Sequence, residues 1–419
     1  MELSLEAYRI IVNNVRSRVD LATLCLVSKG FRRVAERALY NTLFMHETER
    51  TERICKTLVG QPRVAELVEA LTIAIEELVP TTSSSARRAR PETEETLWPA
   101  ISNALKKMSR LRHLSIVIDG SFSSPYSGRL AWILADCPFR LKSFHSDMRW
   151  DENLVRFLNV QDEIEDLYIG DYDEGEEGPG EVEESTGLDE KTPVTTRPSG
   201  PVGPRASHNS LLTLSPTALP HLYTLECTFS EAAIAIVPGR PVSRLKTCFS
   251  RTDPEGKRAE MKEGLTGGGG RGGWYALDIA DAEYEEGFAR DLLRAVVNLT
   301  LGTLRYLGTL VLPVGGRERL LFYGLLMQLR YLCCVELEIS GWNPSPTVVG
   351  PVAFRALGNE LRLYCPGVVK IVFVSMNAGE GEDIGERTTV EWITGEGVAR
   401  VEREVMNGMS GTEGIWRDV

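Results

Sequence analysis

One short pattern of apolar residues returns along most of this chain, and it restricts the possible folds more than any other sequence feature. An apolar residue is followed by two variable residues and then by apolar residues at every second position, as in Leu111, Leu114, Ile116 and Ile118. Such alternation predicts a strand with one buried face. The fourth position falls at Leu71, Leu114, Phe144, Leu167, Leu225, Leu310, Val335 and Ile371, with a doubtful further copy at Leu245.

The copies are unevenly spaced, from 23 to 85 residues apart, and helix-like stretches such as 151–158 and 288–297 lie between several of them. A unit of strand, turn and helix needs neighbours to complete its core. The pattern resembles leucine-rich repeats, although the Asn or Cys usual at the ninth position of that family is missing. The resemblance implies a curved solenoid with its strands on the concave side. Several βα units of an ordinary α/β domain are the alternative.

The first 45 residues have a different pattern, with three short amphipathic segments at helical spacing. They cover residues 5–15, 21–31 and 34–43, and Asp20 stands where the N-cap of the second helix is expected. So few residues cannot bury three apolar stripes among themselves. Some of this apolar surface must therefore meet the rest of the chain or a partner.

The sequence of these residues resembles the F-box found in fungal proteins. The match includes Leu3 to Glu6, Ile11-Val12 and Asp20-Leu21, and its most specific part is Leu26 to Arg32. Ser4 and Val12 replace the usual Pro and Leu. The resemblance implies that the segment docks a Skp-type adaptor and, through it, a cullin scaffold. The apolar residues expected to dock the adaptor are Leu3, Ile11, Val12, Leu21, Leu24, Val27 and Phe31.

We therefore expect an α/β protein with a small all-α F-box-like module at 1–45 and an irregular leucine-rich-repeat-like domain at 46–419. Three segments poor in apolar residues, 80–96, 171–209 and 250–273, are expected to be disordered insertions. The second begins acidic and turns rich in proline, and the third ends in a glycine run that no buried strand precedes. A closing helix is expected at 397–406, and Trp416 is expected to dock onto the last repeat.

Residues between the buried positions of each strand should line the concave face and contact a client protein. The candidates are Thr72, Ser115, Glu226, Thr228, Glu336 and Glu338. They share no single chemistry, so the client is not identified. The hypothesis is a substrate-recognition subunit of an SCF-type (cullin–RING) ubiquitin ligase. The alternative is a non-catalytic repeat scaffold whose N-terminal helices only cap the solenoid.

Composition excludes other classes of function. The net charge of −12 argues against nucleic-acid binding, which relies on basic surface. No apolar run is long enough to span a membrane, and no secretory leader or Cys-x-x-Cys pair is present. The five histidines are scattered, so we expect no metal, no cofactor and no catalytic residues. A non-enzymatic protein of the cytoplasm, the nucleus or both is the expectation.

Overall fold

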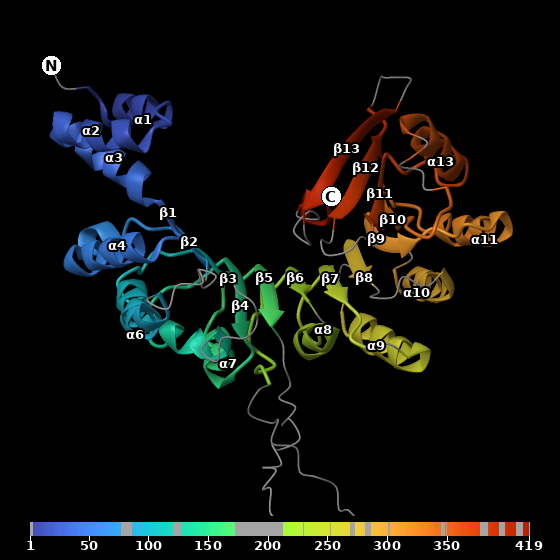
Figure 1. The fold of residues 1–419 in the computed structure, drawn as a ribbon, viewed down its shortest axis with the longest axis horizontal. Coiled ribbons are helices and arrows are strands. Elements are labelled where there is room, and N and C mark those ends of the chain that lie inside the picture. Colours follow the sequence, from blue (N-terminus) through green and yellow to red (C-terminus); the bar gives the residue numbers. More distant parts are fainter. Residues whose placement is uncertain are drawn as a thin grey trace, which may run out of the picture.

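The computed structural model describes residues 3–76, 86–119, 127–171, 213–228, 230–251, 253–268, 273–280, 286–300, 302–344, 348, 350–377, 384–393, 399–407 and 414–418. The chain is a mixed α/β protein built around one 13-stranded sheet, whose strands lie side by side in the order of the sequence. The sheet bends into an arc, with the N-terminal helices at one end and a C-terminal hairpin at the other (Figure 1).

Strands β1 to β11 run parallel, and β12 and β13 are antiparallel additions. The strands are β1 (Thr42–Met45), β2 (Ala70–Glu76), β3 (His113–Asp119), β4 (Ser143–Arg149), β5 (Asp166–Asp171), β6 (Thr224–Cys227), β7 (Arg244–Cys248), β8 (Ala276–Ala280), β9 (Tyr306–Val311), β10 (Cys334–Glu338), β11 (Lys370–Asn377), β12 (Ile384–Glu391) and β13 (Arg400–Asn407).

Helices connect successive strands and cover the outer side of the arc (Figure 1). The described helices between parallel strands gather on one face of the sheet and leave the other face open, as expected when parallel crossovers share one handedness. The helices are α1 (Leu5–Asn13), α2 (Arg18–Val27), α3 (Lys29–Tyr40), α4 (Thr48–Gly60), α5 (Pro62–Ala65), α6 (Ala86–Leu105), the 3₁₀ helix η1 (Ser127–Leu134), α7 (Glu152–Asn159), α8 (Ser230–Ile236), α9 (Pro254–Thr266), α10 (Glu286–Leu299), α11 (Gly316–Leu326), α13 (Pro351–Tyr364) and α14 (Ile415–Asp418).

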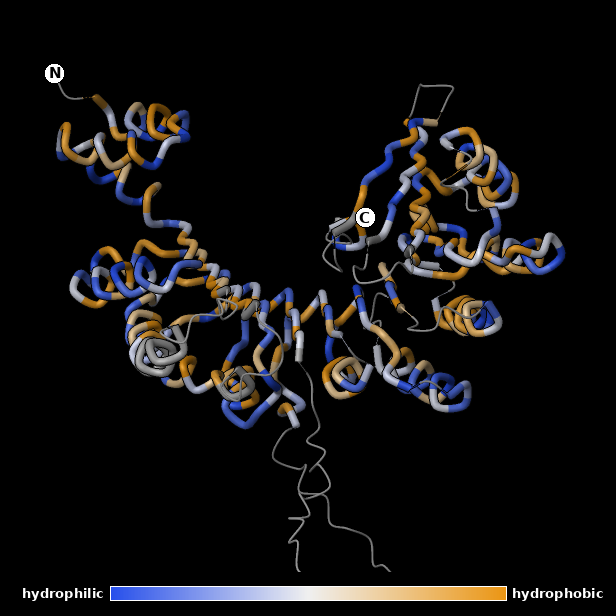
Figure 2. The backbone as a smooth tube through the Cα atoms, in the orientation of Figure 1, coloured by the Kyte–Doolittle hydropathy of each residue, from blue (hydrophilic) through white to orange (hydrophobic). Residues whose placement is uncertain are grey.

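One row of apolar side chains crosses the parallel part of the sheet and forms the middle of the core. Each member pairs with the next across neighbouring strands, and all are buried. Figure 2 shows hydrophobic stretches recurring along the strands and the helices that cover them. The row is Leu43, Leu71, Leu114, Phe144, Leu167, Leu225, Leu245, Leu277, Leu307, Val335 and Ile371.

This row confirms most of the predicted strand positions, including the doubtful one at Leu245, and it corrects one register. Leu307, and not Leu310, pairs with Val335. The ladder then shifts, so that Leu310 lies opposite Leu337. Thr309 lies within the shift and has a positive φ of 43°. Because of this irregularity, the residue of β9 that aligns with Val335 lies three positions earlier than the apolar pattern predicts. The spacing of apolar residues alone does not reveal such a shift.

Two predicted insertions are wrong in part, because they contain helices. Residues 86–96 of the first belong to α6. Residues 254–266 of the third form α9, where Pro254 occupies the first turn and the Asp253 carboxylate accepts a hydrogen bond from the Gly256 amide at 2.7 Å. These start signals outweigh the weak apolar pattern. Residues 172–209 of the second insertion lie outside the described residues, and β5 and β6 on either side of it pair directly.

Both ends of the chain also differ from expectation. The N-terminal unit ends with α3 at Tyr40, because Thr42–Met45 is the first strand of the sheet and not part of a module that extends to residue 45. Residues 400–407 form β13 instead of a closing helix, since they complete an antiparallel hairpin with β12. The chain then returns to the open side of the arc in α14 (Figure 1).

Candidate functional site

The three N-terminal helices enclose a small core of their own. Val12, Leu21 and Ala35 are buried there, and the rings of Tyr8 and Phe31 meet edge to face with 4.6 Å between centroids. The prediction that Val12 and Leu21 contact an adaptor is therefore wrong for this structure, because the other helices cover both side chains. Leu24 and Phe31 pack partly against the same core.

Serine side chains begin all three helices. Ser4, Ser17 and Ser28 each accept a hydrogen bond from the amide three residues later, at 3.2–3.3 Å. Ser17, and not Asp20, is therefore the N-cap of α2. Serine is among the best residues at this position, so Ser4 has a structural function where the F-box pattern has proline.

Apolar residues remain uncovered on the outside of this helical unit, and α2 carries most of them. Leu26 is 80% exposed, Val19 75% and Val27 62%. Val19 and Leu26 are seven residues apart and so lie on one face of α2, while Leu21 and Leu24 face the core. Of the predicted adaptor contacts, Leu3, Ile11 and Val27 are exposed, and Ile10, Val19 and Leu26 were missed. The missed signal is that α2 is apolar around its whole circumference.

The helical unit joins the sheet through polar contacts and through Tyr40 at the end of α3, which packs against the main core. Arg37 and Glu69 form an ion pair at 2.9 Å, and both nitrogens of the Arg63 fork bond to Glu36, the closer at 2.7 Å. The buried cluster of the helical unit shares no residue with the main core of the sheet. Ile11 and Phe31 accordingly do not pack into the sheet. The unit stands at one tip of the arc (Figure 1), and hydrophobic stretches recur along its helices (Figure 2).

The predicted client residues lie on the open side of the sheet but differ in accessibility. Thr72 and Ser115 are half-buried, and Thr228 is exposed. Glu336 and Glu338 are buried, so the prediction that they are open to a client is wrong. Arg387 from β12 covers Glu336, and the Ser340 amide donates to the Glu338 carboxylate at 2.5 Å.

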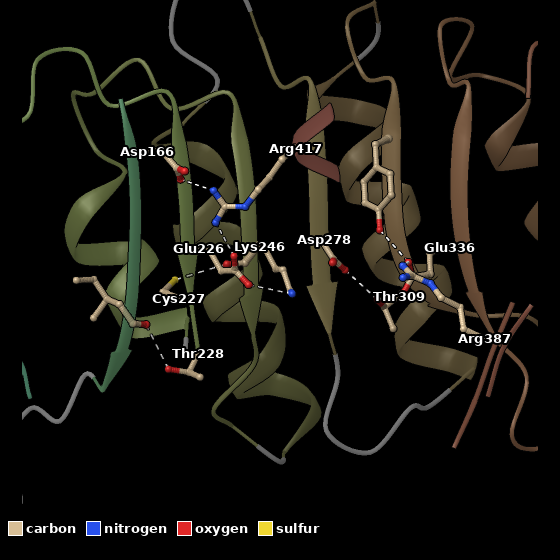
Figure 3. A network of polar contacts seen from close by, with 12 residues as sticks. Asp166, Glu226, Cys227, Thr228, Lys246, Asp278, Thr309, Glu336, Arg387 and Arg417 are labelled. Carbon is tan, nitrogen blue, oxygen red and sulfur yellow. Dashed lines mark hydrogen bonds and ion pairs between the residues drawn. The ribbon is translucent and has the colours of Figure 1, made fainter. Parts of the chain in front are cut away.

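Glu226 belongs to a network that includes the end of the chain (Figure 3). Arg417 on α14 bonds to Asp166 on β5 and to Glu226 on β6, the latter at 2.6 Å. Lys246 on β7 pairs with the other oxygen of Glu226 at 2.9 Å, and His145 bonds to Asp166 at 3.1 Å. A guanidinium fork thus bridges two carboxylates from neighbouring strands, the geometry for which arginine is suited.

The charges of Arg417 and Lys246 and the hydrogen bond to His145 favour the ionised form of the two carboxylates although both are largely buried. Burial alone would raise the pKa of Asp166, but the hydrogen bond from His145 and the charge of Arg417 outweigh it and lower the pKa. Burial would also raise the pKa of Glu226. The charges of Lys246 and Arg417 outweigh this effect, so the pKa is lowered. In turn the carboxylates raise the pKa of Arg417 against the effect of its burial.

A second group of polar residues lies deeper, across β8 to β10 (Figure 3). Tyr306 donates to Glu336 at 3.1 Å, and Thr309 donates to Asp278 at 2.8 Å. Burial, together with the neighbouring charge of Asp278, raises the pKa of Glu336 to about 7. Burial also raises the pKa of Asp278. This group holds a proton near neutral pH and anchors β12 through Arg387.

Other kinds of site have little support in the described part of the chain. There, no three His, Cys, Asp or Glu side chains are grouped to hold a metal ion. A search of the same residues finds no helix with the length and apolar content needed to cross a bilayer. A polar pocket of about 520 Å³ opens beside Arg417, lined by Glu165, Asp166, His221, Tyr223 and Thr224.

Comparison with known proteins adds no family to these observations. No model of a known protein family matches the sequence, and no curated protein matches it either. The function of the chain is therefore inferred from its own residues and their arrangement.

Proposed function

We propose that this protein is a substrate-recognition subunit of an SCF-type (cullin–RING) ubiquitin ligase. An F-box-like unit of α1 to α3 docks a Skp-type adaptor, which connects the chain to the cullin scaffold. The leucine-rich-repeat-like arc holds a client protein on its open side. The chain performs no bond chemistry and acts in the cytoplasm or the nucleus.

The observation that carries this proposal is the uncovered apolar face of α2. Leu26 and Val19 are 80% and 75% exposed on a helix whose other face already packs a core. Apolar groups gathered on an exposed surface mark interaction sites. The polar joint to the sheet leaves this face free, because the contacts Arg37–Glu69 and Arg63–Glu36 lie elsewhere. The adaptor surface is therefore assigned to Leu3, Ile10, Ile11, Val19, Leu26 and Val27.

Co-expression with a Skp-type adaptor tests the proposal. The chain should retain the adaptor through affinity purification, and V19D/L26D should lose it while keeping its helical content by circular dichroism. These substitutions are preferable to Leu21→Asp, because Leu21 is a core residue and its loss would unfold the unit. Equal recovery of the adaptor with both chains would reject the docking function.

One observation favours the second candidate, a scaffold whose N-terminal helices cap the sheet. The Arg18 guanidinium donates a hydrogen bond to the Thr42 carbonyl at 2.7 Å, at the edge strand β1. A capped edge is protected from pairing with other chains. If capping is the function, Arg18→Ala should promote self-association of the chain, and V19D/L26D should change neither adaptor recovery nor solubility.

A further inference from the structure

The last residues of the chain occupy the open side of the sheet at its centre. Helix α14 follows the C-terminal hairpin in sequence, yet it lies over strands from the middle of the arc (Figure 3). Ile415 packs against Val372 and Val374 of β11. Trp416 packs over β8 to β10, and Arg417 reaches β5 and β6. Trp416 therefore docks well before the last repeat, where it was expected.

The site for Trp416 is a row of three small or aromatic residues in register. Ala276 lies beside Tyr306, and Tyr306 lies beside Cys334, on β8, β9 and β10. Trp416 is buried against all three, and Arg244 from β7 donates to its carbonyl oxygen at 2.9 Å. The apolar row ends at the charged Arg244, which lies beside Ala276, and at Lys370, which lies beside Cys334. It therefore forms a bounded subsite for one aromatic side chain.

The site for Arg417 is next to this subsite and is acidic. Asp166 and Glu226 are 29% and 17% exposed, and they present oxygens to the two ends of one guanidinium. Partly buried carboxylates at close range repel each other unless cations lie nearby. His145 bonds to Asp166 and Lys246 pairs with Glu226, whereas Arg417 bonds to both carboxylates. The arrangement selects a basic side chain that directly follows an aromatic one.

The tail fits this site imperfectly, as expected for a segment that another can replace. The Trp416 indole N–H is buried and finds no acceptor among the described residues, which costs free energy. A helix of four residues also has little stability of its own. The site moreover includes Glu226, one of the residues predicted to contact a client. Tail and client would therefore compete for one surface.

We propose that the open face across β5 to β10 binds a partner segment in which an aromatic residue directly precedes an arginine, with Trp416 and Arg417 as its internal stand-in. The inference rests on the proposed function, since the partner would be the client of the ligase. It adds the chemistry by which that client is recognised.

A peptide of residues 412–419 with a fluorescent label is the probe. It should bind the full-length W416A/R417A variant at least tenfold more tightly than the unaltered chain, measured by fluorescence anisotropy. In the unaltered chain the tethered tail competes at a high effective concentration. Peptides carrying W416A or R417A should bind the variant at least tenfold more weakly, whereas a W416F peptide should bind as well as the original, because it buries no unpaired N–H.

Charge reversal provides the matched control. In the W416A/R417A background, D166K/E226K should lose the original peptide and gain affinity for a peptide carrying R417E. Recovery by the reversed peptide shows that the altered chain is folded. The inference is overturned if the W416A/R417A chain binds no peptide, or if it binds the W416A and R417A peptides as well as the original peptide. It is also overturned if the unaltered chain binds the original peptide as tightly as the W416A/R417A chain does.

Adaptor recovery, measured on the same samples, separates this inference from the proposed function. Retained adaptor with no peptide binding overturns the inference alone. Peptide binding in a chain that never retains the adaptor overturns the ligase function and leaves the recognition site standing.

Discussion

Arg387 on β12 donates a hydrogen bond to Glu336 on β10 at 3.3 Å, although β11 lies between these two strands. Both side chains are buried, at 7% and 1% exposure. The contact joins the antiparallel hairpin to the parallel part of the sheet. It also explains why Glu336 is inaccessible to a client protein, although its position on the strand predicts that it faces one.

The first prediction concerns the pH dependence that Glu336 gives to folding. Its pKa is raised from an ordinary 4.5 to about 7 in the folded chain, so between these values the folded state keeps a proton that the unfolded state has lost. Its contribution to stability is complete below pH 4.5 and is lost as pH rises to about 7. Glu336→Gln should remove this loss, about 3 kcal/mol of the free energy of unfolding.

Urea denaturation at pH 5 and pH 8 measures this difference. Glu402→Gln on the exposed part of β13 is the matched control and should leave the pH dependence unchanged. A pH dependence of the same size in Glu336→Gln and the unaltered chain would contradict the assignment.

The second prediction concerns Arg387 itself. Arg387→Met leaves Glu336 without its cation, and the loss of one member of a buried ion pair costs about 3–5 kcal/mol. The loss should be larger at pH 8 than at pH 5, because Glu336 takes up a proton at the lower pH. Denaturation of R387M and of R387M/E336Q should show that the second substitution recovers part of the loss at pH 8. No recovery would mean that Arg387 stabilises the hairpin by packing alone.

The third prediction tests whether the N-terminal helices are an independent core. Leu21→Ala should destabilise these helices by about 2–4 kcal/mol, because a buried leucine is replaced by a cavity. Since its cluster contains no residue of the main core, the sheet should not respond. Hydrogen exchange should accelerate for amides of α1 to α3 and stay unchanged for β3 to β10. Acceleration throughout the sheet would favour the capping function.

The fourth prediction concerns Gly30, near the start of α3. A Cβ atom at this residue would lie 2.5 Å from the Tyr8 ring, so Gly30→Ala should cost about 1–3 kcal/mol by displacing that ring. Gly60, in the last turn of α4, has no atom within 4 Å of such a Cβ, and Gly60→Ala should be neutral or slightly stabilising. Thermal melts of both variants provide the test. Equal melting temperatures would show that Tyr8 does not pack on Gly30.

Much of the sheet could be predicted from the sequence, because a strand with one buried face has apolar residues at alternate positions. Spacing alone places Leu114, Leu167 and Leu225 on strands, and these residues align in the registers that β3 to β6 form. Spacing does not predict strand β8, since Leu277 and Ile279 follow closely on a glycine run that is typical of a loop. The segment that forms β13 is rich in residues that also favour helices, and its pairing with β12 decides the outcome.

The candidate sites depend on contacts that spacing does not encode. Apolar residues lie all around α2, and which of them stay exposed depends on how α1 and α3 cover the helix. Asp166 and Arg417 are 251 residues apart, and only the folded chain brings them together. A tryptophan near the end of the chain indicates docking, but the expected place, the last repeat, is wrong, because Trp416 packs against β8 to β10.

The affinity of a purified Skp-type adaptor for the full chain tests the central claim most directly. Val19→Asp/Leu26→Asp alters the apolar face of α2, and Leu363→Asp alters an equally exposed apolar residue, at 81%, on the distant helix α13. We predict that calorimetry will show tight binding to the unaltered chain and to L363D, with at least a hundredfold loss in V19D/L26D. Equal affinity of all three chains, or no affinity in any, would contradict the docking function.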